Sequence, residues 1–311
     1  MEAKETKVLV TGGAGFIGSH VVDELILLGY QVFVIDDLST GKKKNINPKA
    51  KFYKASIENS ERIFEKEKPE IVFHFAAQAS VAHSIEKPVE DAKNNIIGTI
   101  NLLENCRKYK VKKFIFSSSA AVYGKPNFFP TPENFSTSPD SPYGIAKLSA
   151  EEYLQYYYKA FGLNYLVFRF SNVYGPRQNV ATEAGVVAAF CQKILSKKTL
   201  LIYGDGNQTR DFVYVADIAK VMVLSIKGNA TGIFNISTGK EAKVNDIFDI
   251  LKKQSALQTK EQYVNDKNIG AERSCLDCSK ARKEFNWQST YGIEEGLRLS
   301  FSWFKNNYGK K

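Results

Sequence analysis

Apolar and polar positions alternate along the first 170 residues in two rhythms, one typical of strands and one typical of helices. In the helical rhythm, Ile96, Ile100 and Leu103 fall on one face, with charged residues opposite. The pattern predicts strands at 7–10, 31–35, 52–55, 71–75, 114–117 and 165–170, and helices at 16–28, 57–66, 89–109 and 143–161. Parallel strands joined by helical crossovers form a doubly wound sheet, so we expect an α/β fold.

The pattern of apolar and polar residues changes after residue 171. Helix patterns at 186–196 and 244–253, together with the turn at 204–206, predict a smaller C-terminal α+β domain. Residues 213–236 again read as a helix followed by a strand and are expected to rejoin the sheet. We therefore expect a doubly wound domain made of residues 1–170 and about 213–237, and a second domain made of 171–212 and 238–311.

The composition is that of a globular protein. Of the 311 residues, 43% are hydrophobic and 24% charged, which suffices for a core. We expect no membrane association, since no uncharged apolar run reaches the ~18 residues of a membrane-spanning helix. The N-terminal residues lack the apolar stretch of a signal peptide, so we expect a cytoplasmic protein with reduced cysteines.

The charge of the chain comes from 43 Lys and Arg against 33 Asp and Glu, a net +10. The basic residues are dispersed in short groups without any nucleic-acid-binding motif, so we expect no nucleic-acid partner and only a mild preference for small anions. Cys275 and Cys278 have the spacing of a zinc or redox pair, but a second pair is missing. His20, His74 and His83 are distant in sequence, so we expect no metal.

A glycine-rich segment, Thr11-Gly-Gly-Ala-Gly-Phe-Ile-Gly18, joins the first predicted strand to the first predicted helix. Gly12, Gly15 and Gly18 have a spacing that permits a tight turn, backbone approach to a pyrophosphate and close helix–strand packing. Asp36 ends the second predicted strand, where a carboxylate accepts ribose hydroxyls and repels a 2′-phosphate. The sequence therefore predicts a Rossmann-type dinucleotide site that prefers NAD to NADP.

Tyr143 and Lys147 are four residues apart in a predicted helix that begins with Ser141 as N-cap and Pro142 in the first turn. Both side chains project from one helix face. A phenol has an ordinary pKa of about 10, and a nearby ammonium lowers it enough for general-base catalysis. Ser119 closes the fifth predicted strand and is expected to hydrogen-bond the reacting oxygen and relay its proton.

The order of these motifs resembles that of extended short-chain dehydrogenase/reductases of the nucleotide-sugar epimerase/dehydratase group. The resemblance runs nearly end to end, through the motifs at 11–18, 74–81, 94–99, 117–124, 141–147, 169–178, 202–215 and 276–281. It implies that the first domain binds NAD and the second a nucleotide sugar. The implied cofactor contacts beyond Gly12, Gly15, Gly18, Asp36, Tyr143 and Lys147 are Phe16, Ile17, Asp37, Leu38, Ser39, Ser56, Ile57, Phe75, Ala76, Ala77, Asn95 and Ser117.

The resemblance also implies contacts with a UDP-sugar. They fall at Ser80, Val81, Ser119, Ala120, Ala121, Tyr143, Asn172, Val187, Ile202, Tyr203, Arg210 and Ser274. Arg210 offers a cationic fork for the diphosphate, and the neighbouring Ile202 and Tyr203 offer an apolar slot for the base, although ordinary core burial also explains these two residues.

The expected reaction depends on the residues that follow the fifth strand. Dehydratases of the group resemble S-T-D-E-V-Y-G there, and decarboxylases keep a glutamate, whereas this chain has Ala120 and Ala121, which transfer no proton. The resemblance therefore implies an isomerase, an NAD-dependent 4-epimerase of UDP-glucose and UDP-galactose. The alternatives are a UDP-N-acetylglucosamine 4-epimerase, a 4,6-dehydratase or decarboxylase, and a non-catalytic NAD-sensing protein.

Acceptance of an N-acetyl group is an open question at this stage. In the group a bulky aromatic residue three positions before the aspartate of L-D-x-S-K excludes it, and here that position is the small Ser274. Ser80 also resembles the tolerant branch. The arginine of the R-x-G-D/E motif is missing, so Lys267 or Arg273 is expected to take its place at the diphosphate, and Ser56 stands where an acid is expected near the adenine.

We also expect a homodimer. The predicted helices 89–109 and 143–161 lie on the same side of the sheet, and the second carries Tyr153, Tyr156, Tyr157, Tyr158 and Phe161, a wider aromatic band than one core-facing side requires. By resemblance these helices form a four-helix interface between two subunits.

Overall fold

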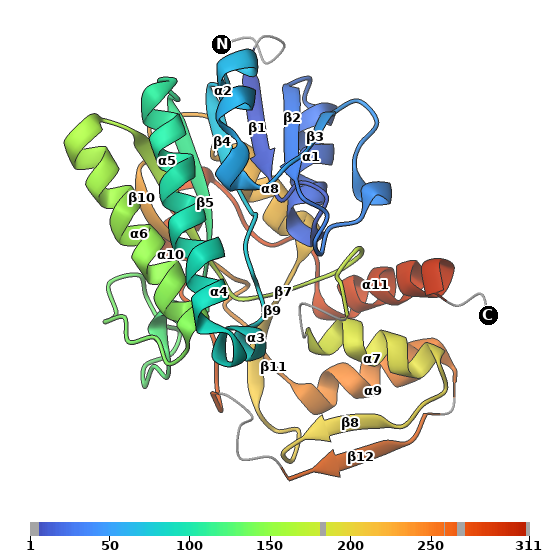
Figure 1. Ribbon diagram of the computed structural model, residues 1–311. Coiled ribbons are helices and arrows are strands. Elements are labelled where there is room, and N and C mark those ends of the chain that lie inside the picture. The colour runs from blue at the N-terminus through green and yellow to red at the C-terminus, as the bar shows by residue number, and fades with distance from the viewer. Residues whose placement is uncertain (1–5, 181–184, 258, 266–270, 309–311) are drawn as a thin grey trace. The chain divides into compact units, whose positions relative to one another are not determined.

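The computed structural model describes residues 6–180, 185–257, 259–265 and 271–308. Two compact units divide the chain (Figure 1). The first comprises residues 1–125, 133–170 and 219–234, and the second comprises 126–132, 171–218 and 235–311.

The first unit is built on a seven-stranded sheet in the order β10-β6-β5-β4-β1-β2-β3. The strands are β1 Lys7–Thr11, β2 Gln31–Asp36, β3 Lys51–Lys54, β4 Ile71–His74, β5 Lys113–Ser119, β6 Asn164–Phe170 and β10 Gly232–Ile236. From β6 to β3 all neighbouring strands are parallel, and Val8 pairs with Ile71 on one side and Val32 on the other. The central strands are buried on both faces, which explains why they read as continuous apolar runs.

Helices join these strands as crossovers. They are α1 Phe16–Leu27, α2 Glu61–Glu67, α3 Val81–Glu86, α4 Pro88–Ala92, α5 Gly98–Lys108, α6 Pro142–Phe161 and α8 Val215–Leu224, with short 3₁₀ turns η1 Lys43–Asn45, η2 Ile57–Asn59 and η4 Ala120–Tyr123. In Figure 1, α5 and α6 lie side by side, and the two helices are in contact. Leu102 of α5 and Leu154 of α6 share a buried cluster with Leu9 and Phe114 of the sheet.

Two predicted helices differ in detail from those observed. The helix expected at 57–66 is divided at Ser60, whose hydroxyl donates to the carbonyl of Ile57 at 2.7 Å and separates η2 from α2. The helix expected at 89–109 contains the π-helical turn η3 Lys93–Ile97 between α4 and α5. Hydrophobic periodicity does not reveal either feature, because both depend on local side-chain and backbone hydrogen bonds.

The second unit has two small sheets, β11-β9-β7 and β12-β8. Its elements are β7 Asn172–Tyr174, α7 Val186–Leu195, β8 Leu200–Tyr203, β9 Thr209–Tyr214, β11 Glu241–Lys243, α9 Val244–Ser255, β12 Glu261–Val264, α10 Ser279–Phe285 and α11 Ile293–Tyr308. Phe190 of α7, Phe248 of α9 and Phe304 of α11 belong to one buried cluster. Of the stretch 213–236, residues 213 and 214 belong to β9 of the small sheet, whereas β10 joins the main sheet beside β6 after α8.

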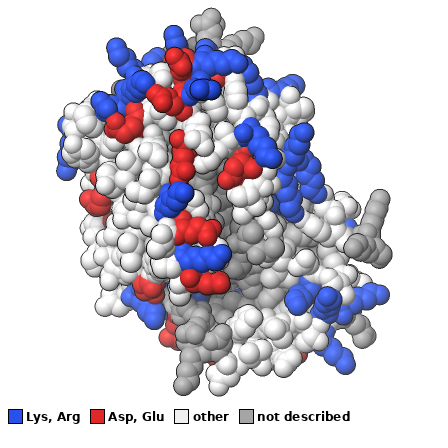
Figure 2. Space-filling model, in the orientation of Figure 1, with Lys and Arg blue, Asp and Glu red and all other residues white. Residues whose placement is uncertain are grey.

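The surface carries mixed charge. Figure 2 shows basic side chains interspersed with acidic ones on the face that it draws. On α5, Arg107 pairs with Glu104 at 2.6 Å and Lys108 with Glu61 at 2.5 Å. Within the described ranges, no helix combines the length and apolar character needed to cross a membrane.

Candidate active site

The glycine-rich loop between β1 and α1 is packed so tightly that side chains have no room. Gly12 has a left-handed φ of 70°, and a Cβ added there would lie 2.6 Å from the backbone nitrogen of Ala76. A Cβ at Gly18 would lie 2.3 Å from the carbonyl oxygen of Gly12. Gly15 is the N-cap of α1 and gives the first turn no side-chain cap. The helix N-terminus therefore offers backbone amides and a positive dipole end, which fit the pyrophosphate of a dinucleotide.

Asp36, the last residue of β2, faces this loop. Its Oδ2 accepts a hydrogen bond from the amide of Ala14 and its Oδ1 accepts one from the amide of Leu38, both at 2.9 Å. Burial raises the pKa of Asp36, and these amide hydrogen bonds partly oppose that rise. Carboxylate oxygens keep further acceptor capacity beyond these two bonds, so the fixed side chain fits the adenosine ribose hydroxyls of NAD.

The other predicted cofactor residues gather at the same edge of the sheet, where the parallel strands end. Ser117 lies near the end of β5, Asn95 in η3, and Phe16 and Ile17 at the start of α1. The remaining ones follow three strands directly: Asp37, Leu38 and Ser39 after β2, Ser56 and Ile57 after β3, and Phe75, Ala76 and Ala77 after β4. Ser56 does not stand free, because its Oγ accepts from the amide of Glu58 at 3.3 Å and caps η2.

Tyr143 and Lys147 lie one turn apart near the start of α6. Ser141 is the N-cap, and its Oγ accepts from the amide of Gly144 at 3.2 Å. The Nζ of Lys147 lies 5.7 Å from the centre of the Tyr143 ring and donates to the carbonyl of Ser117 at 2.8 Å. The structure thus brings the Tyr143 ring, the Lys147 ammonium and the end of β5 close to one another.

Lys147 is buried, with 4% of the residue exposed. Burial lowers the pKa of Lys147 to about 8, while the carboxylates of Asp91 and Glu151 act to raise it. Its titration therefore falls close to neutral pH, where small changes in the surrounding charge alter its protonation.

Ser119 ends β5 and opens the short turn η4. Its Oγ accepts a hydrogen bond from the amide of Ala121 at 3.2 Å, which fixes the side chain at the strand end. Ala120 and Ala121 begin η4, where both are partly exposed, and neither carries a group that exchanges protons. At the start of α6, the amide of Tyr143 donates to Ser84 Oγ at 3.2 Å, which ties α6 to α3.

A buried ion pair lies one turn beyond Lys147. Glu151 is fully buried and pairs with Arg169 of β6 at 2.5 Å, and its Oε1 also accepts from Ser118 Oγ at 2.5 Å. The hydrogen bonds and charge of Glu151 raise the pKa of Arg169 above its ordinary value although burial acts to lower it. The pair fixes α6 against β5 and β6. It was absent from our sequence predictions, although a glutamate four residues after Lys147 lies on the same helix face.

His74 connects the glycine loop to η3. Its Nδ1 lies 2.7 Å from Thr11 Oγ1 and its Nε2 lies 3.0 Å from Thr99 Oγ1, whose hydroxyl donates to the carbonyl of Asn95 at 2.7 Å. Because Thr99 uses its proton on that carbonyl, Nε2 of the neutral ring donates to Thr99 and Nδ1 accepts from Thr11. Burial lowers the pKa of His74 to about 3, so the ring is neutral at physiological pH. This link was also missed, since nothing in the sequence relates His74 to Thr99.

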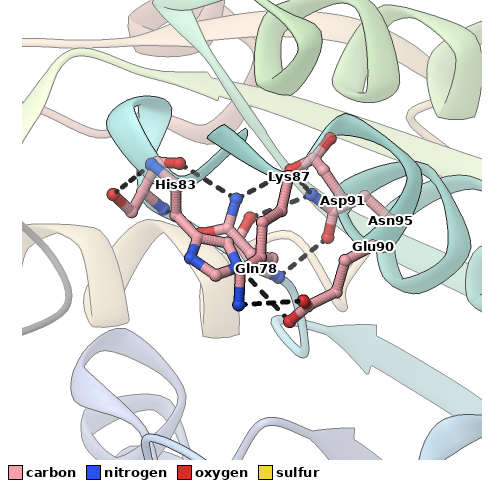
Figure 3. Close-up of polar contacts among 7 residues, drawn as sticks. Gln78, His83, Lys87, Glu90, Asp91 and Asn95 are labelled. Atoms are coloured by element: carbon pink, nitrogen blue, oxygen red, sulfur yellow. Dashed lines mark hydrogen bonds and ion pairs between the residues drawn. The ribbon is translucent and has the colours of Figure 1, made fainter. Parts of the chain in front are cut away.

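The loop after β4 is held by a cluster of amides and one carboxylate (Figure 3). Gln78 and Asn95 exchange two hydrogen bonds, from Gln78 N to Asn95 Oδ1 at 2.8 Å and from Asn95 Nδ2 to Gln78 O at 2.9 Å. Both side-chain amides also donate to Asp91 Oδ1, at 2.8 and 2.9 Å. Ser80 is the N-cap of α3, and its Oγ accepts from the amide of His83, with Val81 exposed beside it.

The predicted substrate residues of the second unit fall into two groups. Val187 and Ile202 are each 1% exposed and belong to the apolar core. Asn172 is exposed, and Tyr203, next to Ile202 on β8, is 50% exposed because adjacent strand residues point to opposite faces. The buried pair can contribute shape and backbone, but not exposed side-chain surface.

Arg210 and Ser274 lie together in the second unit. Ser274 pairs with β9 through bonds to Thr209 O at 3.2 Å and from Asp211 N at 2.8 Å, so it lies beside Arg210. Arg210 donates from Nη1 to the carbonyl of Thr209 at 2.8 Å, and burial lowers the pKa of Arg210 from its ordinary value. Arg273 pairs with Glu241 at 2.6 Å. Lys267, the other proposed substitute at the diphosphate, lies outside the described residues.

The cysteines are buried free thiols, and burial raises the pKa of Cys275 to about 12. Cys275 Sγ lies 3.7 Å from Asp211 Oδ2, a carboxylate that also accepts from Thr238 and Gly239. Over the part of the chain that is described, no group of three or more His, Cys, Asp or Glu residues is arranged to hold a metal.

The fold and the site define a dinucleotide-binding α/β protein with a Tyr–Lys pair at the carboxyl edge of its parallel sheet. The model of the NAD dependent epimerase/dehydratase family matches residues 8–237. A putative UDP-glucose 4-epimerase of Methanocaldococcus jannaschii is 46% identical over 304 residues, 96% of this chain and 99% of that protein. This chain belongs to the NAD dependent epimerase/dehydratase family, and the enzyme class and the NAD cofactor expected from the sequence are confirmed.

Solved structures of epimerases are also similar to this chain. The crystal structure of UDP-glucose 4-epimerase with UDP-glucose from Thermotoga maritima has 47% identity and a TM-score of 0.94, covering 97% of this chain and 99% of that one. The UDP-N-acetylglucosamine 4-epimerase of Methanobrevibacter ruminantium, in complex with UDP-N-acetylmuramic acid, has 36% identity and a TM-score of 0.92, covering 98% and 99%. The predicted fold class is therefore confirmed.

Proposed function

We propose that the protein is an NAD-dependent 4-epimerase that interconverts UDP-glucose and UDP-galactose. The observation that carries the proposal is the residue pair that follows Ser119. Beside an assembled Tyr143–Lys147 pair, Ala120 and Ala121 offer no acid or base for a second proton transfer at a neighbouring carbon. The names of the relatives from Methanocaldococcus jannaschii and Thermotoga maritima agree with this reaction.

The first unit holds the cofactor in this proposal. The glycine loop and the α1 N-terminus take the pyrophosphate, Asp36 takes the adenosine ribose, and Asn95 and Phe75–Ala77 line the remainder. When bound there, NAD supplies the oxidising power at C4 of the sugar and then the reducing power that restores it. All the other steps belong to side chains of the chain itself.

Tyr143 is the catalytic base and then the catalytic acid. Its phenolate takes the proton from the sugar 4-hydroxyl and later returns a proton to the same oxygen after the 4-keto sugar has turned its other face. The Lys147 ammonium, fixed by the Ser117 carbonyl, stabilises the phenolate. Ser119, held by the Ala121 amide, donates a hydrogen bond to the reacting oxygen.

The second unit binds the nucleotide sugar in this proposal. Arg210 holds the diphosphate, Tyr203 provides an exposed aromatic face for the base, and Asn172 and Ser274 approach the sugar. Val187 and Ile202 support that surface from the core. Ser80 and Val81 of the first unit stay predictions from the sequence as sugar contacts.

A second candidate activity is 4-epimerisation of UDP-N-acetylglucosamine. Ser274 is small where an aromatic side chain would exclude an N-acetyl group, and one relative at 36% identity is a UDP-N-acetylglucosamine 4-epimerase. A dehydratase or decarboxylase is disfavoured by Ala120 and Ala121. An NAD-sensing role without catalysis is disfavoured because the Tyr–Lys pair is assembled.

We also propose a homodimer formed through α5 and α6. On α6, Ile145 is 51% exposed, Tyr156 57% and Phe161 48%, which is an unusual apolar surface for a helix that also covers the sheet. A monomeric sedimentation coefficient at micromolar concentration would contradict this interface. The cytoplasmic location stays a prediction from the sequence.

The test of the activity is an incubation of purified protein with UDP-glucose, UDP-galactose and their N-acetylated counterparts, with products separated by chromatography and identified by mass. The proposal expects each 4-epimer to form from the other at unchanged mass, without net NADH. A product lighter by water, release of CO2 or steady accumulation of NADH would contradict it.

A further inference from the structure

Asp91 is a buried carboxylate to which the mechanism above gives no role. It lies on α4 and is 1% exposed. Its Oδ1 accepts from Gln78 Nε2 at 2.8 Å and from Asn95 Nδ2 at 2.9 Å, and Figure 3 shows both amides turned toward it. Among the described residues its buried Oδ2 has no hydrogen-bond partner. A charged oxygen without a partner is costly in a protein interior, so its position requires an explanation.

The neighbours of Asp91 do not neutralise it. Gln78 and Asn95 are uncharged, and no side chain in the described part of the chain forms an ion pair with it. His83 of α3 acts on Asp91 through its charge, but it pairs with Glu90 at 3.3 Å, and Lys87 also pairs with Glu90, at 3.8 Å. Asp91 therefore has no ion-pair partner among the described residues, beneath the loop that follows β4.

α4 packs against α6, which carries Lys147, as well as against α3 and η3. Lys147 is a buried cation whose hydrogen-bond partner, the carbonyl of Ser117, is neutral. The other carboxylate near it, Glu151, is already matched by Arg169 at 2.5 Å. The charge of Lys147 also acts to lower the pKa of His74, which is a neutral ring. Of the two carboxylates that act to raise the pKa of Lys147, Asp91 and Glu151, Asp91 is the one that has no ion-pair partner among the described residues.

We infer that Asp91 is a positioning residue for the epimerase reaction, whose carboxylate, fixed by Gln78 and Asn95, is the counter-charge of the Lys147 ammonium beside Tyr143. This inference rests on the proposed function. It bears on the orphaned oxygen, because the attraction between Asp91 and Lys147 partly offsets the cost of burying both charges. It also gives the Gln78–Asn95 pair a purpose, which is to aim the carboxylate.

Asp91 and Lys147 each affect the pKa of the other. Burial lowers the pKa of Lys147 to about 8, and Asp91 is the first of the charges that oppose this effect. Burial raises the pKa of Asp91, and Lys147 is among the groups that oppose that rise. A negative charge at Asp91 disfavours loss of a proton from either member of the Tyr143–Lys147 pair. Removing the charge therefore makes the pair lose its first proton at lower pH.

The decisive variant is Asp91→Asn, which keeps the size of the side chain and its Oδ1 acceptor but removes the charge. The matched control is Glu90→Gln, which removes a charge from the adjacent, exposed position on α4. The first readout is the pH dependence of kcat/KM for UDP-glucose. The second is the pH dependence of phenolate absorbance near 295 nm in the NAD-loaded protein, from which the signal of a Tyr143→Phe variant is subtracted.

The expected result for Asp91→Asn is a displacement of both profiles to lower pH by about one unit, with both profiles unmoved in Glu90→Gln. A loss of activity equal at every pH, with the absorbance profile unmoved, would show a merely structural role and overturn the inference. If the wild type does not act on UDP-glucose, the proposed function fails while the absorbance titration still tests Asp91.

Should Asp91→Asn fail to fold, the wild type provides the test. The inference expects Lys147 to remain an ammonium at pH 7, measured by NMR of isotope-labelled lysine side chains with Lys147 assigned from a Lys147→Arg variant. A neutral Lys147 at that pH would overturn the inference.

Discussion

The two units prepare their candidate site residues in different ways. In the first unit the chemical groups are fixed by buried polar contacts: Lys147 by a carbonyl, Asp36 by two amides and His74 by two threonines. In the second unit Val187 and Ile202 are fixed by apolar packing, while Tyr203 and Asn172 stay exposed.

This difference matches the tasks proposed for the two units. Proton transfer requires groups held within a fraction of an ångström, and buried hydrogen bonds provide that precision. Recognition of a nucleotide and a sugar tolerates wider variation in side-chain position. We therefore expect substitutions in the first unit to impair chemistry and stability, and those in the second to alter binding and selectivity.

The largest effect is expected for Tyr143→Phe. Losing the acid–base group should lower kcat by about 10³-fold or more while NAD remains bound. Initial rates with UDP-galactose and NAD content after gel filtration measure both quantities. Tyr153→Phe is the control, because Tyr153 lies on the same helix with 39% exposure and should leave kcat unchanged. Wild-type turnover in Tyr143→Phe would contradict the assignment of proton transfer to the first unit.

The next largest effect is expected for Glu151→Gln. It leaves Arg169 buried without its counter-charge, which costs about 3–5 kcal/mol of unfolding free energy. The expected result is a clear decrease in the urea midpoint of unfolding. Tryptophan fluorescence or circular dichroism measures this midpoint. Glu152→Gln, the exposed neighbour on α6, should leave the midpoint where it is. Equal midpoints for the two variants would show that this buried pair does not stabilise α6.

Tyr143 and Glu151 also illustrate which features of the site can be predicted from the sequence alone and which cannot. Tyr143 and Lys147 could be predicted as neighbours because helical spacing brings them together within a single element. The glycines could be predicted because their spacing within one loop is typical of a dinucleotide-binding turn. The Glu151–Arg169 pair requires β6 to lie beside β5, which is a property of the sheet order rather than of any local pattern. The link from His74 to Thr99 spans 25 residues for the same reason.

In the second unit, the sequence left a different question open, namely which side chains of a strand are buried. The motif at 202–215 predicted which segment matters but not which of two adjacent residues faces the core. The strand alternation gives Ile202 and Tyr203 opposite faces, and only the packing of β8 decides that Ile202 is the buried one.

Selectivity for the sugar should change with Ser274→Tyr. A bulky ring beside Arg210 should reduce activity on UDP-N-acetylglucosamine by about 10²-fold and leave UDP-glucose within about twofold. The ratio of kcat/KM for the two sugars measures the effect, with Ser274→Ala as the control of small size. If both sugars lose activity equally, Ser274 does not act as a gate.

A smaller effect is expected from the titration of His74. Its folded-state pKa of about 3 lies below the ordinary unfolded value of about 6.5, so the unfolded chain binds the proton first as pH falls. Stability attributable to His74 is therefore complete above pH ~6.5 and declines progressively toward pH 3, by about 2 kcal/mol at pH 5. Urea midpoints at pH 7 and pH 5 should differ more in the wild type than in His74→Gln. An identical pH dependence in the two proteins would contradict a buried neutral ring.

The smallest expected effect compares two arginines of the second unit. Arg210→Lys keeps the charge but removes the bidentate fork, so the KM for UDP-glucose should rise about tenfold with kcat nearly unchanged. Arg273→Lys should change KM less than twofold, because Arg273 is exposed and already paired with Glu241 at 2.6 Å. A larger rise in Arg273→Lys would mean that Arg273 leaves Glu241 to hold the diphosphate. Binding in the second unit would then depend on a rearranged ion pair, and the contrast between a prepared catalytic site and an adaptable binding surface would become sharper.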